Sequence, residues 1–94
     1  MEQLPKSQEL VSPLLLVLEK AGKPLSNSEM ENGVISELGI PATLASSIHS
    51  GKRTELQYRL AWARTKAKSS GFIAREDREV WKLTELGKNW LLAN

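Results

Sequence analysis

The spacing of apolar residues changes at Gly71, and this change limits the chain to folds that combine helices with a small sheet. Before Gly71 the apolar residues recur every three or four positions, as on one face of an α-helix. After it, residues 72–75 and 80–83 form two short runs rich in aromatic and β-branched side chains, as in strands. The polar residues 76–79 separate the runs, which predicts a β-hairpin with a loop of about four to six residues.

Two helices are expected in the first half of the chain. The first covers roughly Ser7–Ala21, where Pro13 indicates either a kink or a helix that begins there with Ser12 as its N-cap. The second follows a capping box at residues 26–29 and ends before Gly39, because glycine readily adopts the left-handed conformation that terminates a helix.

The third helix is the clearest element and is expected over residues 53–69, beginning at Arg53 or Thr54. At about 100° per residue, its small or apolar side chains fall on one side: Leu56, Leu60, Ala63 and Ala67. The opposite side carries Thr54, Tyr58, Ala61 and Thr65, flanked by Gln57, Arg64 and Lys68. The first side is therefore expected to face the core, and the second to be open to a partner.

The segment between Gly39 and Lys52 is longer than the usual turn of about 3–4 residues between paired helices. It must hold extra structure, and a short turn of helix is expected within residues 42–51 that includes Leu44, Ala45 and Ile48. After the hairpin, Thr84 is expected to cap a last helix, which packs Trp90 and Leu91, with Leu86, onto the core.

The order helix, helix, helix, hairpin, helix predicts a mainly α chain with a small β-hairpin (α+β), arranged as a winged helix-turn-helix. Residues 53–69 would be the recognition helix, and the hairpin over residues 72–84 would be the wing. We expect one such domain over residues 1–94, with residues 1–5 frayed.

Positive charge is concentrated in the second half. Residues 1–51 contain three lysines against six glutamates, a net charge of −3, whereas residues 52–94 contain ten basic residues against five acidic ones, a net charge of +5. This asymmetry indicates a face that meets a polyanion. The alternative is a lysine-rich helix that is merely solvated.

Composition excludes several classes of protein. The chain has no cysteine, so it forms no disulfide or thiolate metal site, and with His49 as its one histidine it makes no histidine-rich zinc site. The longest apolar run, residues 14–18, is far too short to span a membrane. The N-terminus lacks a basic signal-peptide region, so we expect a cytoplasmic protein with no membrane partner, no metal and no cofactor.

Two segments resemble one family closely. Residues 59–65 read R-L-A-W-A-R-T and residues 78–87 read R-E-V-W-K-L-T-E-L-G, with S-G-K at residues 50–52 and S-G-F-I at residues 70–73. Their spacing resembles the N-terminal domain of Mrr-type restriction endonucleases. The resemblance is strong over residues 50–87, and over residues 7–40 it is only a hydrophobic pattern.

The resemblance implies a winged-helix module that recognises DNA and is attached to a nuclease domain that cleaves methylated DNA. Two residues depart from the family pattern: Glu79 stands where glycine is usual, and Ala67 where a larger aliphatic residue is usual. The nuclease half is absent, because no acid-x-Lys triplet occurs and Asp77, the sole aspartate, lies in the expected loop. We therefore expect no catalytic residue in this chain.

A helix that enters the major groove needs short side chains at its centre and hydrogen-bond donors around them. Ala61 and Thr65 meet the first requirement, and Lys52 and Arg53 are expected to bind phosphate at the helix N-terminus. The candidate DNA-binding residues are Lys52, Arg53, Thr54, Gln57, Tyr58, Arg59, Ala61, Arg64, Thr65, Lys68, Arg75 and Arg78.

Several of these residues have a structural alternative. Arg59 either contacts phosphate or pairs with an acid, and the hairpin residues Arg75 and Arg78 either touch DNA or are solvated. Trp62 is expected to cover the edge of the core, and His49 to be a surface or capping residue.

The sequence thus predicts a module that binds double-stranded DNA. The first alternative is a winged helix that binds an acidic protein or a second copy of itself, forming a homodimer. The second is the targeting part of a longer nuclease, with a nuclease domain or subunit as its partner.

Overall fold

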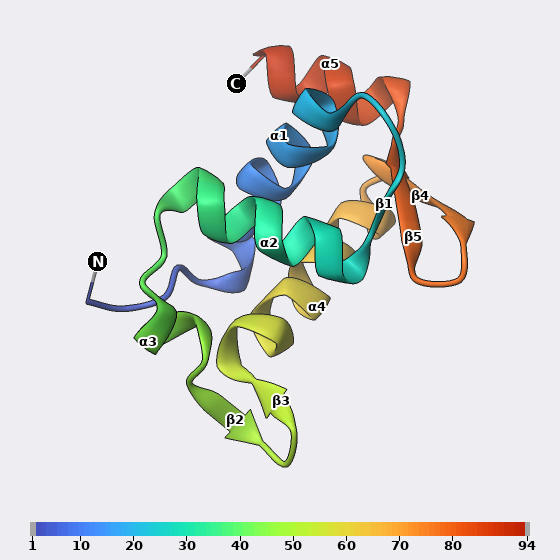
Figure 1. Cartoon of the computed structure of the whole chain (residues 1–94). Helices are drawn as coiled ribbons and strands as arrows, with labels where there is room; N and C mark the ends of the chain where they lie inside the picture. The colour runs from blue at the N-terminus through green and yellow to red at the C-terminus, as the bar shows by residue number, and fades with distance from the viewer. Residues whose placement is uncertain (1, 94) are drawn as a thin grey trace.

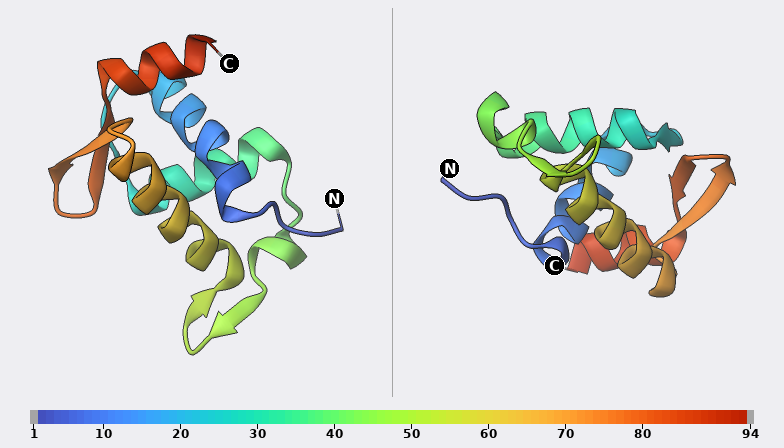
Figure 2. Two further views of the ribbon diagram at one scale, coloured as in Figure 1. Left: turned by 180° about the vertical axis from the view of Figure 1, so that it is seen from behind. Right: turned by 90° about the horizontal axis from the view of Figure 1, so that it is seen from below.

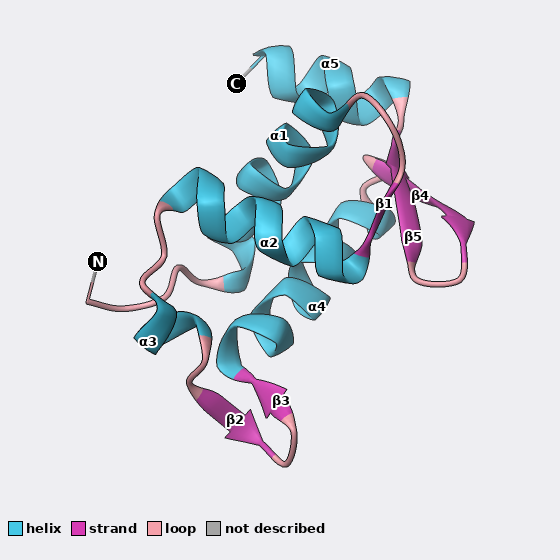
Figure 3. Ribbon diagram, in the orientation of Figure 1, coloured by secondary structure: helices cyan, strands magenta, loops and turns pink. Residues whose placement is uncertain are grey.

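Residues 2–93 are described by a computed structural model, in which helices pack together with two small antiparallel sheets (Figures 1 and 3). The prediction of a mainly α chain with a small antiparallel sheet is confirmed. The elements are a 3₁₀ turn η1 (Ser7–Leu10), α1 (Val11–Ala21), β1 (Leu25–Ser26), α2 (Asn27–Leu38), α3 (Ala42–Ala45), β2 (Ile48–Ser50), β3 (Arg53–Thr54), α4 (Glu55–Ser69), β4 (Ile73–Asp77), β5 (Val80–Leu83) and α5 (Glu85–Ala93).

The interpretation in which a helix begins at Pro13 with Ser12 as its N-cap is wrong. The chain enters through η1, and α1 then begins at Val11, so Pro13 is the third residue of α1 and not the first. Proline is tolerated in the first turn of a helix, where N–H groups lack intrahelical partners. Ser12 is therefore inside α1 and does not cap it.

The ends of α2 form as the sequence predicts. Ser26 Oγ accepts from Glu29 N at 3.1 Å, and Glu29 Oε1 accepts from Ser26 N at 2.9 Å, which completes the capping box. Gly39 ends α2 in the left-handed conformation at φ 64°. Between these ends, a Cβ at Gly33 would overlap Val17 Cγ1 of α1, so glycine permits the close packing of α1 on α2.

The core lies between α1, α2 and α4. The four residues expected on the inward side of α4, Leu56, Leu60, Ala63 and Ala67, are all at most 1% exposed. Thr54 caps α4 by accepting from Gln57 N at 3.0 Å. The helix predicted over residues 53–69 therefore begins two residues later, at Glu55.

The long connection between α2 and α4 contains more than the predicted turn of helix. α3 is that turn, but Ile48 lies outside it in β2, is 65% exposed, and pairs with Thr54 of β3. Gly51 adopts φ 54° in the tight turn between β2 and β3. A second hairpin, which projects at the lower end of the molecule in Figure 1, therefore precedes α4.

The predicted hairpin after α4 is present with a shorter loop. β4 extends to Asp77 and β5 begins at Val80, so only Arg78 and Glu79 connect them, and the expected loop of four to six residues is wrong. The backbone of Glu79 adopts the left-handed conformation at φ 56°. Glycine adopts this conformation most readily, so this position of the turn suits glycine. β1 adds to the other edge of β5, giving the strand order β1-β5-β4.

The last helix and the N-terminal segment both pack on the core. Thr84 Oγ1 accepts from Gly87 N at 3.0 Å, as expected for a cap, and Trp90 and Leu91 of α5 pack against the core, whereas Leu86 is 55% exposed. The expectation that residues 1–5 fray is wrong for Leu4, which is only 9% exposed. Met1 lies outside the described residues.

None of the helices within residues 2–93 combines the length and the apolar character needed to cross a membrane.

Candidate nucleic-acid interface

The side of α4 that faces away from the core is open at its middle, around Thr65. Thr65, at its centre, is exposed, and its hydroxyl donates to the Ala61 carbonyl oxygen at 3.0 Å, which holds the side chain close to the helix. α5 packs on α1, and the left view of Figure 2 shows it at the opposite end of the molecule from the β2–β3 hairpin. Small side chains and an open approach would let the α4 backbone come close to a ligand.

A groove runs along one flank of this open side, between α4, the N-terminus of α2 and the β4–β5 hairpin. It consists of two adjoining hollows of about 650 Å³ and 220 Å³. Seven of the predicted site residues line it: Arg53, Gln57, Ala61, Arg64, Thr65, Lys68 and Arg75. The structure adds residues that the sequence did not single out for a site: Asn27, Ser28, Glu31, Leu60, Ser69, Glu79 and Trp81.

Trp81 connects three elements around this groove. The indole Nε1 donates to Asn27 Oδ1 at the start of α2, at 2.9 Å. Arg75 Cζ lies 5.5 Å and Lys68 Nζ lies 5.9 Å from the ring centroid, which is within the range of cation–π attraction. Trp81 is a core residue, only 7% exposed, and its ring also lies next to two cations of the groove.

Arg64 is the most enclosed cation of the groove. Burial lowers the pKa of Arg64 below its usual value and the nearby charge of Arg53 lowers it further, whereas Glu31 and Glu79 raise it. Within residues 2–93, no carboxylate lies within 4.0 Å of either arginine. Two guanidinium groups therefore share one small polar hollow without a direct counter-ion.

Gln57 is less available than the sequence suggested. Its side-chain oxygen accepts from Thr54 N at 3.1 Å as part of the α4 capping box, and its Nε2 donates to Glu31 Oε1 of α2 at 3.2 Å. Both ends of the amide are occupied. The side chain thus fixes α4 against α2, and a contact with a base would require these bonds to break.

The structure does not place Lys52 and Arg53 at the N-terminus of α4, where the sequence predicted that they would bind phosphate. Lys52 lies in the turn of the β2–β3 hairpin and Arg53 in β3, both ahead of the first turn of α4. Glu55 N donates to the Ser47 carbonyl oxygen at 2.8 Å, so this N–H group is already used, as is that of Gln57. The two cations therefore belong to the hairpin and not to the helix terminus.

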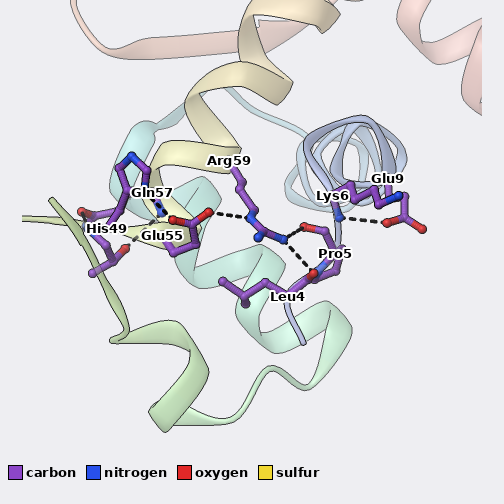
Figure 4. A network of polar contacts seen from close by, with 9 residues as sticks. Leu4, Pro5, Lys6, Glu9, His49, Glu55, Gln57 and Arg59 are labelled. Atoms are coloured by element: carbon purple, nitrogen blue, oxygen red, sulfur yellow. Dashed lines mark hydrogen bonds and ion pairs between the residues drawn. The ribbon is translucent and has the colours of Figure 1, made fainter. Parts of the chain in front are cut away.

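Arg59 takes part in a network of polar contacts at the start of α4 (Figure 4), and Tyr58 is held beside this network by a ring contact with His49. His49 of β2 stacks on Tyr58 with ring centroids 4.1 Å apart and pairs with Glu55 at 2.5 Å. Arg59 Nε donates to Glu55 at 2.9 Å, and Arg59 Nη1 donates to the carbonyl oxygen of Leu4 at 2.8 Å.

This network favours the structural alternative for Arg59, which pairs with an acid and holds the N-terminal segment. His49 lies on the surface, as expected. Trp62 does not cover the core: it is 50% exposed, so its expected role is wrong.

Arg78, the last of the candidate DNA-binding residues, lies at the tip of the β4–β5 hairpin. It is exposed, and its backbone N donates to Asp77 Oδ1 at 2.7 Å, which stabilises the tight turn. The hairpin thus carries Arg75 beside the groove and Arg78 at its tip, together with Glu79, whose acid faces the groove. Within the described part of the chain, no group of three or more His, Asp or Glu side chains is arranged to hold a metal ion.

Comparison with known families matches residues 8–93 to the family described as the Mrr N-terminal domain, which is essentially the whole chain. This confirms the resemblance seen in residues 50–87. The match is to the N-terminal domain and includes no nuclease domain. No curated protein and no solved structure matches the chain.

Proposed function

Because the chain belongs to the family of Mrr N-terminal domains of Mrr-like restriction proteins, we propose that it binds double-stranded DNA as a winged helix-turn-helix module. In this proposal it is the DNA-recognition part of an Mrr-like restriction system, and residues 1–94 form one domain.

The connectivity supports this architecture. α2 and α4 would be the helix-turn-helix pair, and the β4–β5 hairpin that follows α4 would be the wing. β1, between α1 and α2, pairs antiparallel with β5 and so ties the wing to the start of α2. The wing is therefore held at a fixed place beside α4, where it can contact the same duplex.

The roles of individual residues follow from where they lie. Ala61 and Thr65 would let α4 approach the bases of the major groove closely. Arg64 and Lys68, on the flank of that side, would supply hydrogen-bond donors to bases or phosphates. Arg78, at the tip of the wing, would contact the sugar–phosphate backbone.

One observation carries the proposal: α4 and the hairpins at its two ends carry cations with no ion-pair partner among residues 2–93. They are Lys52, Arg53, Arg64, Lys68, Arg75 and Arg78. Cations left unpaired next to an uncovered helix are suited to a polyanionic partner, because binding releases counterions from the nucleic acid.

A salt titration tests the proposal. With about 4–6 phosphate contacts, the binding constant for duplex DNA should fall with a log–log slope of roughly −4 to −5 in salt. Replacing Arg64 and Lys68 with alanine should weaken binding at every salt concentration. The matched control removes the same charge elsewhere, as Lys23→Ala with Lys88→Ala, and should bind as the unaltered chain does. Absence of duplex binding at low salt, or a flat salt dependence, contradicts the proposal.

A second candidate is a winged helix that binds protein, including a second copy of itself. The half-exposed Trp62 of α4, together with Glu31 and Glu79 in the groove, favours it. Under this alternative, substitution of Arg64 and Lys68 would leave self-association, measured by sedimentation, unchanged and no duplex binding would be seen. Attachment to a nuclease domain or subunit remains a prediction from the family.

A further inference from the structure

The β2–β3 hairpin, residues 48–54, enters the proposal so far only through its unpaired cations Lys52 and Arg53. We infer that it is a second DNA-contacting hairpin, which grips the sugar–phosphate backbone at the end of α4 opposite the β4–β5 wing. The inference rests on the proposed function, since it assumes that α4 docks on a duplex.

Position is the first argument. One hairpin immediately precedes α4 and the other follows it after a short turn, so the two flank the same helix at its opposite ends (Figure 1). α4 has 15 residues and is about 22 Å long at a rise of 1.5 Å per residue. The major groove is about 12 Å wide. Elements at the two ends of a helix of that length would therefore lie over the backbones that border the groove.

Orientation is the second argument. Tyr58 lies on the open side of α4, and the ring of His49 stacks on it with an interplanar angle of 16°. The same imidazole pairs with Glu55, and Ser47 accepts from Glu55 N. These contacts fix the hairpin against the side of α4 that would face the duplex, so that it extends this surface and does not turn away from it.

Charge is the third argument. Residues 42–54 contain no acidic side chain, and the hairpin is rich in the hydroxyl and cationic groups that proteins use to contact phosphates. Lys52 and Arg53 are exposed and have no carboxylate within 4.0 Å among the described residues. Glu55, the nearest acid along the chain, is already matched by His49 and Arg59.

Ile48 is the fourth argument. It is 65% exposed, and the other two residues of β2 are exposed as well. Apolar side chains beside cations are common where proteins contact the sugars and edges of the minor groove. The hairpin therefore presents both kinds of group that the backbone and its adjoining minor groove would meet.

The experiment compares salt dependence in three forms of the full chain, each with a labelled 20-base-pair duplex. The double variant Lys52→Ala with Arg53→Ala should flatten the log–log slope by about 1.8, at about 0.9 for each lost phosphate contact. Raising the salt from 50 to 200 mM should then cost the variant about tenfold less affinity than it costs the unaltered chain. Lys23→Ala with Lys88→Ala, which removes the same charge far from α4, should keep the original slope.

Amide NMR shifts provide a readout that does not depend on substitution. Adding duplex to the unaltered chain should move the signals of residues 48–53 as well as those of α4. The inference is overturned if the unaltered chain binds with a steep salt slope, yet the Lys52 and Arg53 variant keeps that slope and the hairpin signals stay in place. It is also overturned if the Lys23 and Lys88 control flattens the slope equally. Failure of the unaltered chain to bind would instead refute the proposed function.

Discussion

Arg59 joins three parts of the chain that are far apart in sequence. Its guanidinium donates to Glu55 one turn earlier in α4 and to the carbonyl oxygens of Leu4 and Pro5, 55 and 54 positions away. Glu55 in turn pairs with His49 of β2. The first turn of α4 thus anchors both the N-terminal segment and the β2–β3 hairpin, so charge at this point contributes to the fold as well as to its surface.

The Glu55 carboxylate should make stability depend on pH in acid. The hydrogen bond from Arg59, and secondarily the one from His49, lowers the pKa of Glu55 below its usual value of 4.5. A carboxylate whose pKa is lower in the folded than in the unfolded chain stabilises the fold above the unfolded pKa, and this contribution is lost as the pH falls through the folded pKa. Glu55→Gln should therefore lower the urea midpoint at pH 7 and reduce its decline between pH 5 and pH 3.

The capping carboxylate provides a comparison for this prediction. The hydrogen bond from Ser26 N lowers the pKa of Glu29 in the same direction, so Glu29→Gln should also reduce the acid decline. Parallel curves for the unaltered chain and Glu55→Gln between pH 5 and pH 3 would show that the Arg59 and His49 contacts contribute nothing to the pH dependence of unfolding.

Single residues were the least predictable part of the site. Gln57 has the right chemistry to read a base, but its amide is bonded to Glu31, 26 positions away, and no local pattern reveals such a partner. Trp62 has the size of a core residue, yet the small residues Ala63 and Ala67 fill the space under α4 instead. Residue type therefore indicated which positions can bind, and tertiary contacts decided which remain free.

Among the elements, those with a buried face or a cap were predictable. The capping boxes at Ser26 and Thr54 are recognisable sequence motifs, and the apolar side of α4 gives a clear periodic signal. The β2–β3 hairpin leaves none, because all three residues of β2 are exposed and no alternation of apolar and polar residues results. The same exposure that hid this hairpin from sequence analysis makes it available to a partner.

Substitutions of Glu79 test the role of the β4–β5 hairpin as the wing. At φ 56° its backbone favours glycine, so Glu79→Gly should raise the free energy of unfolding by about 0.5–1 kcal/mol, after allowing for the greater freedom of glycine in the unfolded chain. Glu79→Gln keeps the strained backbone and should leave stability unchanged. Because both variants remove a negative charge beside the groove, both should bind duplex DNA more tightly at low salt.

Thermal unfolding and fluorescence anisotropy separate the two effects at Glu79. A gain in affinity for Glu79→Gly alone would mean that the shape of the turn matters and its charge does not. If neither variant gains affinity, the tip of the β4–β5 hairpin does not approach phosphates, which contradicts the role given to the wing.

At the scale of the whole molecule, the two halves of the sequence differ in net charge and contribute different parts of the surface. The first half carries a net charge of −3, and of its glutamates Glu31 reaches the groove, where it accepts from Gln57. The second half, at +5, contributes α4 and the β4–β5 hairpin, while α5 packs against α1. Net positive charge therefore lies on α4 and on the β2–β3 hairpin, whereas the three basic residues of the β4–β5 hairpin are balanced by three acidic ones.

The central claim is that the open side of α4 lies against the duplex. A single negative charge at the middle of that side tests it most directly, since Thr65 is exposed and Thr65→Glu leaves the core untouched. The matched control is Asn89→Glu, which adds the same charge to an exposed position of α5. We predict that Thr65→Glu weakens duplex binding in anisotropy titrations by at least about tenfold, the equivalent of roughly 1.4 kcal/mol, while Asn89→Glu binds as the unaltered chain does. Equal affinity for the Thr65→Glu variant and the unaltered chain would contradict the account.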